Sequence, residues 1–145
     1  MTSNPPANIP RLIPYVYYED VAAALDWLTR AFGFREKSRM TGPDGKVSHA
    51  EMEYEDCLVM MGCPGPDYEA PRHAGRVHQA YYIYVDAVDE HFRRARAAGA
   101  RVLSEPEDKF YGDRSYGVAD PEGHHWYFAQ HLRDVSPEEL AKHPG

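Results

Sequence analysis

The strongest constraint on the fold is a pattern that occurs twice along the 145-residue chain. Asp20 stands before a run of apolar residues at helical spacing, and Gly33 ends that run. Asp86 and Gly99 stand in the same positions 66 residues later. Asp is a favourable residue at a helix N-cap, and Gly is common just after a helix. Two copies of one pattern predict two structurally similar modules.

Each copy predicts the element order β-α-β-β-β. The first copy spans residues 11–63, and a segment rich in proline, glycine and charge, residues 64–76, is predicted to link it to the second copy at 77–131. Residues 1–10 are expected to form a flexible lead, and residues 132–145 a tail with a short helix. The predicted strands lie at 12–18, 34–40, 47–54 and 57–61 in the first copy and at 77–85, 101–105, 115–119 and 124–130 in the second.

Length and charge narrow the class of protein. A chain of 145 residues suggests one domain that holds both modules. The formal net charge of −7 disfavours binding to nucleic acid or to an anionic membrane through bulk charge. No apolar run approaches the roughly 18 residues of a membrane helix, and the polar N-terminus lacks a signal-peptide pattern, so we expect a cytoplasmic protein. Cys57 and Cys63 form no CxxC pair and are expected to be reduced and inert.

Three short motifs point to a known family. Val85-Asp-Ala-Val-Asp89, Arg96-Ala-Ala-Gly-Ala100 and Asp120-Pro-Glu-Gly-His124 together resemble the vicinal oxygen chelate superfamily. That superfamily includes glyoxalase I, extradiol dioxygenases, fosfomycin-resistance enzymes and bleomycin-binding proteins. The stretch Pro106–Arg114, followed by Trp126, is similar to one glyoxalase-like branch. The resemblance covers nearly the whole chain.

The resemblance implies an α+β fold. Two βαβββ modules would form a curled mixed β-sheet cup with the helices on its convex side, often completed across a homodimer. In the metal-dependent members of the family, the ligands come from the first and last strands of each module. In this sequence those positions fall near Ile13, near Met60 or Met61, near Ala80 and near Tyr127. Because Ile, Met and Ala do not bind a divalent cation and Tyr is a poor ligand, the sequence predicts neither the family metal nor another cofactor.

His49 and Glu51 are the candidate catalytic residues. They stand two apart on a predicted strand, so both side chains point to one face, while the intervening Ala50 points to the other. A carboxylate beside an imidazole makes the ring more basic, and the pair could work as acid and base. The alternative is a solvated polar stripe that continues to Glu53. A metal site made by these three residues, outside the family positions, is a further possibility.

Tyrosine is unusually frequent, with eleven residues in the chain. Several tyrosines stand at alternate positions of predicted strands, so they should share the concave face. An aromatic cup that carries hydroxyl groups binds flat organic molecules by stacking and a few hydrogen bonds. The alternative is a dimer interface, where Tyr is also enriched. The predicted ligand-binding residues on the strands are Tyr15, Tyr17, Glu53, His78, Tyr82, Tyr84, His125 and Tyr127.

The segment Lys109–Arg114 is predicted to be a loop with an aromatic pair, a glycine and opposite charges. It could cover the pocket, with Tyr111 beside the ligand and Arg114 meeting an anionic group. In the alternative, Asp113 and Arg114 hold the loop in place by hydrogen bonds.

The sequence leaves two classes of function open. The first is a protein that binds a small aromatic or polar organic molecule without the family metal, similar to the drug-sequestering members of the family. The second is an enzyme of the lyase, isomerase or dioxygenase type. It would be metal-free with His49 and Glu51 as acid and base, or it would use a metal site that we do not recognise. The expected partners are a small-molecule ligand and a second copy of the chain, with no nucleic acid and no membrane.

Overall fold

The computed structural model describes residues 2–143, and the chain divides between Ala74 and Gly75 into two compact units. Residues 1, 144 and 145, at the ends of the predicted lead and tail, lie outside the described part. Each unit holds a four-stranded curled sheet whose first strand runs parallel to its last, while the other strand pairs are antiparallel. The predicted α+β fold of two βαβββ modules is therefore confirmed.

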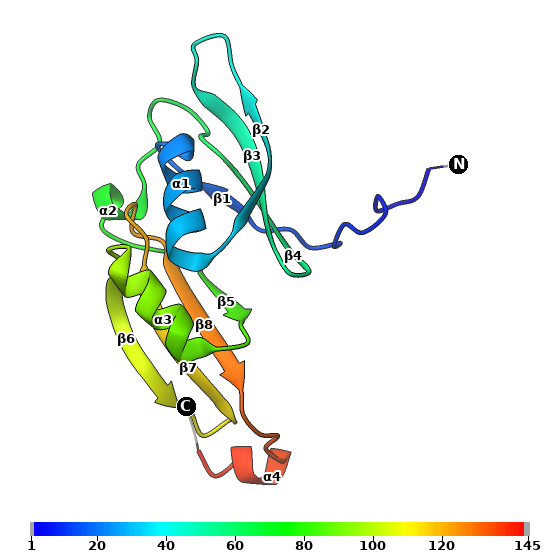
Figure 1. Ribbon diagram of the computed structural model, residues 1–145, viewed down its shortest axis with the longest axis vertical. Coiled ribbons are helices and arrows are strands. Elements are labelled where there is room, and N and C mark those ends of the chain that lie inside the picture. The colour runs from blue at the N-terminus through cyan, green and yellow to red at the C-terminus, as the bar shows by residue number, and fades with distance from the viewer. Residues whose placement is uncertain (1, 144–145) are drawn as a thin grey trace. The chain divides into compact units, whose positions relative to one another are not determined.

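The elements of the first unit are, in chain order, β1 (Tyr15–Tyr17), α1 (Val21–Phe32), β2 (Arg35–Thr41), β3 (Val47–Tyr54), β4 (Cys57–Gly62) and α2 (Pro71–Ala74). The sheet order is β1-β4-β3-β2. Helix α1 lies over β2 and β3 (Figure 1) and buries its apolar stripe against them. The short helix α2 falls within the segment that the sequence predicts to be a linker.

Helix α1 begins and ends as the sequence predicts. The Asp20 carboxylate accepts a hydrogen bond from the backbone N–H of Ala23 at 3.0 Å, which satisfies one of the free donors of the first turn. Gly33 ends the helix in the left-handed region, with a φ of 77°. Leu28 and Phe32 are fully buried on the face that contacts the sheet.

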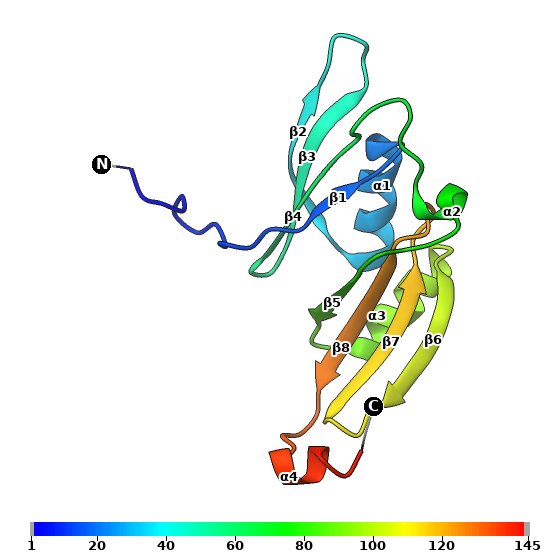
Figure 2. The same ribbon diagram turned by 180° about the vertical axis from the view of Figure 1, so that it is seen from behind.

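The elements of the second unit are β5 (Ala80–Tyr84), α3 (Val88–Ala97), β6 (Arg101–Asp108), β7 (Asp113–Ala119), β8 (His125–His131) and α4 (Pro137–Leu140). The sheet order is β5-β8-β7-β6, and α3 packs against β6, β7 and β8 (Figure 2). Strand β5 begins at Ala80 rather than at Val77, so His78 precedes the strand instead of lying on it as predicted. Strand β6 continues to Asp108, past its predicted end at Glu105, and β7 begins at Asp113, inside the segment predicted to be a loop.

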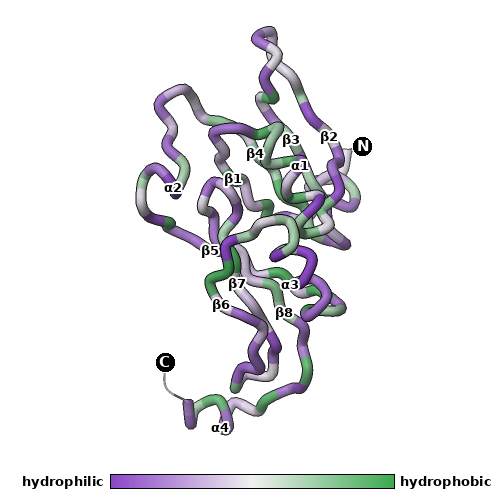
Figure 3. The backbone as a smooth tube through the Cα atoms, turned by 60° about the vertical axis from the view of Figure 1, so that its left-hand side comes forward, coloured by the Kyte–Doolittle hydropathy of each residue, from purple (hydrophilic) through white to green (hydrophobic). Residues whose placement is uncertain are grey.

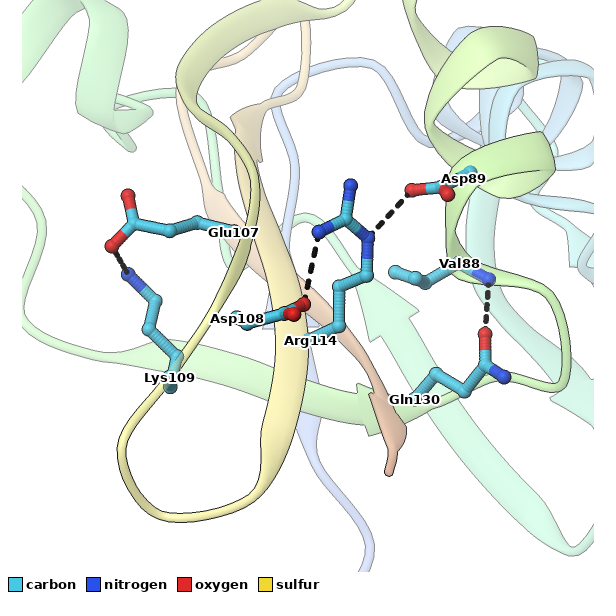
Figure 4. A network of polar contacts seen from close by, with 7 residues as sticks. All are labelled: Val88, Asp89, Glu107, Asp108, Lys109, Arg114 and Gln130. Atoms are coloured by element: carbon cyan, nitrogen blue, oxygen red, sulfur yellow. Dashed lines mark hydrogen bonds and ion pairs between the residues drawn. The ribbon is translucent and has the colours of Figure 1, made fainter. Parts of the chain in front are cut away.

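The start of α3 corrects a second prediction. Ala87 is the N-cap residue, it makes no side-chain capping bond, and Asp86 does not cap the helix. Instead, the side-chain carbonyl of Gln130 in β8 accepts a hydrogen bond from the backbone N–H of Val88 at 3.1 Å (Figure 4). The backbone N–H group that the Asp86 carboxylate was expected to bind therefore donates to a side chain of β8 instead.

Strand pleating gives each sheet one face covered by its helix and one uncovered face. In β3, Ala50 and Met52 are fully buried on the covered face, and His49 lies on the other face. In β8, Trp126 and Phe128 are fully buried on the covered face beneath α3. We call the faces opposite α1 and α3 the first and the second uncovered face.

The turn that carries the Asp120-Pro-Glu-Gly motif has a structural role. The Asp120 carboxylate is buried and accepts hydrogen bonds from the backbone N–H groups of Glu122 and His124 at 3.1 and 3.0 Å. Its second oxygen accepts the indole N–H of Trp126 at 3.0 Å. One carboxylate therefore closes the predicted turn between β7 and β8 and orients the largest core side chain of the second unit.

Strand β2, one of the two edge strands of the first sheet, is polar. Every residue of β2 is exposed, and its tube is largely purple in Figure 3. Charged side chains on an edge strand discourage unwanted pairing with other chains. Among residues 2–143, no helix combines the length and the apolar character that crossing a bilayer requires.

Candidate functional site

The first uncovered face carries the two tyrosines of β1. Tyr15 and Tyr17 are 46% and 48% exposed, and their ring centroids lie 5.8 Å apart in an edge-to-face arrangement. The intervening Val16 is buried under α1. The strand therefore presents both rings on one side, as the alternation in the sequence predicts.

A chain of hydrogen bonds links Tyr15 to the two candidate catalytic residues. The Tyr15 hydroxyl lies 2.9 Å from Nδ1 of His49, and Nε2 of His49 lies 3.2 Å from Oε2 of Glu51. An ionised Glu51 only accepts, so Nε2 carries the proton and Nδ1 accepts from the hydroxyl. Both ring nitrogens are thus occupied. The Tyr15 hydroxyl can give its proton to His49 and take one from a ligand on this face.

Gly62 makes the contact between Tyr15 and His49 possible. This glycine pairs with His49 across β3 and β4, and a Cβ built on it would lie 2.8 Å from the Tyr15 hydroxyl oxygen. Any side chain at this position would therefore occupy the space through which the hydroxyl reaches the imidazole.

Glu53, the last residue of the predicted stripe, has a cationic partner. The Arg35 guanidinium donates to Oε1 of Glu53, with Nε at 3.0 Å. A ligand-binding role for Glu53 therefore stays a prediction, and such a ligand would share the carboxylate with Arg35.

The second uncovered face carries two of the three tyrosines of β5, Tyr82 and Tyr84, bound to a buried carboxylate. Tyr82 and Tyr84 are 46% and 57% exposed, and their ring centroids lie 5.6 Å apart. Both hydroxyls donate to Oδ2 of Asp113, at 2.7 and 2.9 Å. Asp113, the first residue of β7, is only 3% exposed.

His131 and Asp134 extend this cluster. Nδ1 of His131 lies 2.7 Å from Oδ1 of Asp113, and Nε2 lies 2.7 Å from Oδ1 of Asp134. The hydrogen bonds to these two carboxylates raise the pKa of His131 above its ordinary value. Both ring nitrogens therefore donate, and the imidazolium form is favoured.

The pKa values of the other members follow from the same contacts. Burial by itself would raise the pKa of Asp113, but the hydrogen bonds from His131, Tyr82 and Tyr84 outweigh it and the pKa is lowered. Burial and the bond to Asp113 raise the pKa of Tyr82, and hydrogen bonding with Tyr111 contributes to the rise. The pKa of Tyr84 is raised chiefly by its bond to Asp113. The two phenols stay protonated and the carboxylate stays ionised over a wide pH range.

Tyr127 and His125 lie half-buried on the same face of β8 as His131. The Tyr127 ring packs over Gly117 of β7, where an added Cβ would lie 2.4 Å from a ring carbon. Tyr127 also pairs with Tyr82 across β5 and β8. The structure therefore gathers four predicted ligand-binding residues of the second unit on one face: Tyr82, Tyr84, His125 and Tyr127. His78, which precedes β5, is exposed.

The segment 109–114 makes the anchoring bonds of its second interpretation, while a ligand-binding role for Tyr111 and Arg114 stays a prediction. Arg114 lies in β7 next to Asp113, and its guanidinium bonds to Asp89 and Asp108 at 2.9 Å each (Figure 4). Alternation along β7 points Arg114 to the face opposite Asp113. Arg114 and Asp113 thus both make anchoring bonds, and an anion bound to Arg114 would compete with two carboxylates.

Sequence reasoning did not assign Asp113, His131 or Asp134 to a site. A signal for two of them exists in the alternation of residues along the last two strands. Asp113, Ser115 and Gly117 share one face of β7, and His131 continues the face of β8 that begins at His125 and Tyr127. Asp134 lies beyond the end of β8, so alternation along the strand gives no signal for it. It joins the cluster only because of the path of the tail.

A cavity of about 810 Å³ lies elsewhere in the first unit. It is bounded by the start of α1, the turn between β2 and β3, and the segment after β4, and its lining includes Lys46, Cys63 and Tyr68. None of the predicted site residues lines it. The predicted residues lie on the open sheet faces.

The Glyoxalase/Bleomycin resistance protein/Dioxygenase superfamily matches residues 9–128. The chain belongs to this superfamily, which confirms the resemblance carried by the sequence motifs.

Individual proteins and solved structures are similar to this chain. The chain is 37% identical over 137 residues to the uncharacterized protein Mb0911c of Mycobacterium bovis, covering 90% of each chain. It is similar to the crystal structure of TioX from Micromonospora sp. ML1, with 36% identity and a TM-score of 0.71 over 85% of this chain and 99% of that one. The fosfomycin resistance protein FosX of Listeria monocytogenes shares the fold, with 15% identity and a TM-score of 0.63 over 90% of this chain and 96% of that one.

The residues at the family's metal positions do not fit a divalent cation. Met60 pairs with Tyr15 and Tyr127 pairs with Tyr82, so these are the last-strand residues of the uncovered faces, whereas Met61 is fully buried under α1. A thioether and a phenol are poor ligands for hard or borderline cations. Within residues 2–143, no three His, Cys, Asp or Glu side chains are grouped so that they could hold a metal ion.

Proposed function

We propose that this protein binds a small aromatic or polar organic molecule on its tyrosine-rich uncovered faces, without the family metal. The observation that carries the proposal is the pair of half-exposed tyrosine rings on each sheet, with three of the four hydroxyls held by His49 or Asp113. Fixed hydroxyls keep the rings in place, which lowers the entropy lost when a flat ligand stacks on them. Membership in a superfamily that includes bleomycin resistance proteins supports the same function.

The binding unit that we propose is a homodimer in the cytoplasm. Members of the superfamily often build their ligand site across two chains, and Tyr is enriched both in ligand pockets and in interfaces. The net charge of −7 argues against a nucleic acid or an anionic membrane as the partner.

An NMR titration of the intact chain with quinoline, a flat uncharged aromatic probe, tests the proposal. We expect saturable shifts of backbone amides in β1, β5 and β8. Replacing a tyrosine pair, as in Tyr82→Ser with Tyr84→Ser, removes two stacking contacts worth together about 1–3 kcal/mol, or roughly 5- to 150-fold in affinity. The control is Leu12→Ser, because Leu12 is the most exposed large apolar side chain and belongs to neither pair. The corresponding variant of the first face is Tyr15→Ser with Tyr17→Ser. Unchanged affinity for quinoline in both of these double variants would contradict the proposal.

The second candidate function is an enzyme of the same superfamily, favoured by the chain from Tyr15 through His49 to Glu51. On this reading Tyr15 touches the substrate, and His49 with Glu51 takes up its proton. His49→Gln separates the two candidates. A binding protein loses affinity only modestly, whereas an enzyme loses roughly 10²- to 10⁴-fold in rate when its general base is removed.

A further inference from the structure

Tyr82 and Tyr84 have no hydroxyl proton left to donate to a ligand. A phenol carries one hydroxyl proton. Both Tyr82 and Tyr84 donate that proton to the same oxygen of Asp113. The Tyr84 oxygen, on the more exposed of the two side chains, therefore presents lone pairs to a ligand, whereas the Tyr82 oxygen also shares a hydrogen bond with Tyr111.

The buried carboxylate also strengthens these oxygens as acceptors. A hydroxyl that donates to an ionised group becomes more polarised, and its lone pairs accept a second hydrogen bond more strongly. Asp113 is buried, so the surrounding water weakens this effect little. A ligand that approaches Tyr84 therefore meets a strong acceptor.

The charge around the two tyrosines is negative. Asp113 and Asp134 are carboxylates on either side of the His131 ring, so the three groups together carry one net negative charge when the ring is protonated. The cations nearby are already paired with carboxylates. These pairs are Arg114 with Asp89 and Asp108, Lys109 with Glu107, and Arg133 with Glu139.

The aromatic rings on this face also favour a positively charged ligand. Tyr82 and Tyr84 meet edge to face at an interplanar angle of 78°, and both residues are about half exposed. Phe110 and Tyr111, on the turn before β7, are 38% and 37% exposed. The face of an aromatic ring is electron-rich and attracts an organic cation.

Resting on the proposed function, we propose that the second uncovered face selects organic cations: small aromatic amines whose ammonium N–H groups donate to Tyr84 and Tyr82 while the aromatic part stacks on the rings. A carboxylate or other anion finds no donor in the hydroxyls of Tyr82 and Tyr84, because Asp113 holds their protons. The selectivity belongs to the tyrosines together with Asp113.

The test compares three probes of one shape on the intact chain at neutral pH: benzylamine, which is an ammonium ion, benzyl alcohol, which is neutral, and benzoate, which is an anion. We expect benzylamine to bind about tenfold tighter than benzyl alcohol, the size of one charge-assisted hydrogen bond, and benzoate to bind more weakly than both. NMR titration gives each dissociation constant and shows whether the shifts centre on β5.

Tyr84→Phe and Tyr82→Phe remove the acceptors and keep the rings. We expect the double variant to lose most of the preference for benzylamine while its affinity for benzyl alcohol changes little. The matched control is Tyr81→Phe, the same change on the same strand, because Tyr81 lies on the covered face against Trp126. This control should keep the full preference.

The possible failures are distinguishable. If the probes bind but benzylamine has no advantage over benzyl alcohol and benzoate, the cation inference is overturned and the proposed function stands. The same holds if the double Tyr→Phe variant keeps the full preference. If neither quinoline nor any of the three probes binds saturably, both the inference and the proposed function are overturned.

Discussion

The two tyrosine pairs occupy the same place in the two sheets but serve different partners. Tyr15 and Tyr17 lie on β1, Tyr82 and Tyr84 lie on β5, and each of these strands runs parallel to the last strand of its sheet. Their rings meet edge to face at nearly equal distances, 5.8 and 5.6 Å. In the first sheet the Tyr15 hydroxyl bonds to the imidazole of His49, whereas in the second the Tyr82 hydroxyl bonds to the buried carboxylate of Asp113.

Residues on the neighbouring strands account for this difference. Gly62 stands opposite Tyr17 in the first sheet, and Ala129 stands opposite Tyr84 in the second. A Cβ at Gly62 would lie 2.8 Å from the Tyr15 oxygen, and Ala129 carries a Cβ at the corresponding place of the second sheet. On the next strand His49 pairs with Gly62, whereas Ser115 pairs with Ala129. The second sheet therefore has no imidazole at that place, and its tyrosines bond to Asp113 instead.

The contrast has a chemical consequence. In the first sheet the hydroxyl bonds to a group that can take its proton, so the face can support proton transfer. In the second sheet the hydroxyls bond to an ionised carboxylate and stay neutral, so they can orient a ligand but do not pass a proton to their partner. The same scaffold thus carries two uncovered faces of different chemistry.

The largest expected effect on stability comes from Gly112, because this residue of the second unit packs against the tail that carries Asp134. Gly112 has a φ of 100°, and a Cβ on it would lie 2.0 Å from the carbonyl oxygen of Arg133, just before Asp134. We expect Gly112→Ala to lower the free energy of unfolding by about 3 kcal/mol, from backbone strain and a clash that only movement of the tail relieves. Urea unfolding followed by circular dichroism measures it.

Gly45→Ala is the matched control in the first unit. Gly45 also has a positive φ, 82°, but a Cβ on it meets nothing within 4 Å. It should cost only about 1 kcal/mol, the strain of the backbone alone. Equal losses in the two variants would show that the tail does not press on Gly112.

A smaller effect is expected when the path between Tyr15 and His49 is closed. Gly62→Ala puts a methyl group 2.8 Å from the Tyr15 oxygen and 3.0 Å from the carbonyl oxygen of Ser48. We expect the hydrogen bond to His49 to break, at a cost of about 1 kcal/mol in the free energy of unfolding. The ¹⁵N signals of the His49 ring report the change, since they depend on which nitrogen accepts.

Tyr15→Phe is the companion variant, because it deletes the same hydrogen bond without a clash. Both variants should give the same His49 ring signals. If Gly62→Ala left those signals as in the unmodified chain, the glycine would not be what opens the first face to this contact, and the comparison with Ala129 would lose its basis.

The parts of the fold that the sequence predicts well depend on near neighbours in the chain. The cap at Asp20 reaches only to Ala23, and the strand Val47–Tyr54 shows its faces by simple alternation. The predicted cap at Asp86 failed because Gln130, 42 positions beyond Val88, supplies the acceptor. Helix propensity carries no information about such a distant side chain.

The candidate site shows the same limit. Alternation places Tyr15 with Tyr17, and Tyr82 with Tyr84, on one face each, because both members of a pair lie on one strand. It does not show that Asp113 accepts from Tyr82 and Tyr84, since that contact depends on the register of three strands.

The smallest expected effect distinguishes the two faces by pH. The pKa of His131 is raised above its ordinary value of 6.5, so its contribution to stability is complete below pH 6.5 and is lost as the pH rises through the raised value. The pKa of Asp113 is lowered from 3.8, so its contribution is complete above pH 3.8 and is lost as the pH falls through the lowered value. The pair therefore stabilises the second unit most between pH 3.8 and 6.5. The difference in melting temperature between the unmodified chain and His131→Gln should be widest in this window and should shrink toward alkaline pH. A difference that stays constant, or grows as the pH rises, would mean that His131 supports Asp113 as a neutral ring and that the charge assigned to the second face is wrong.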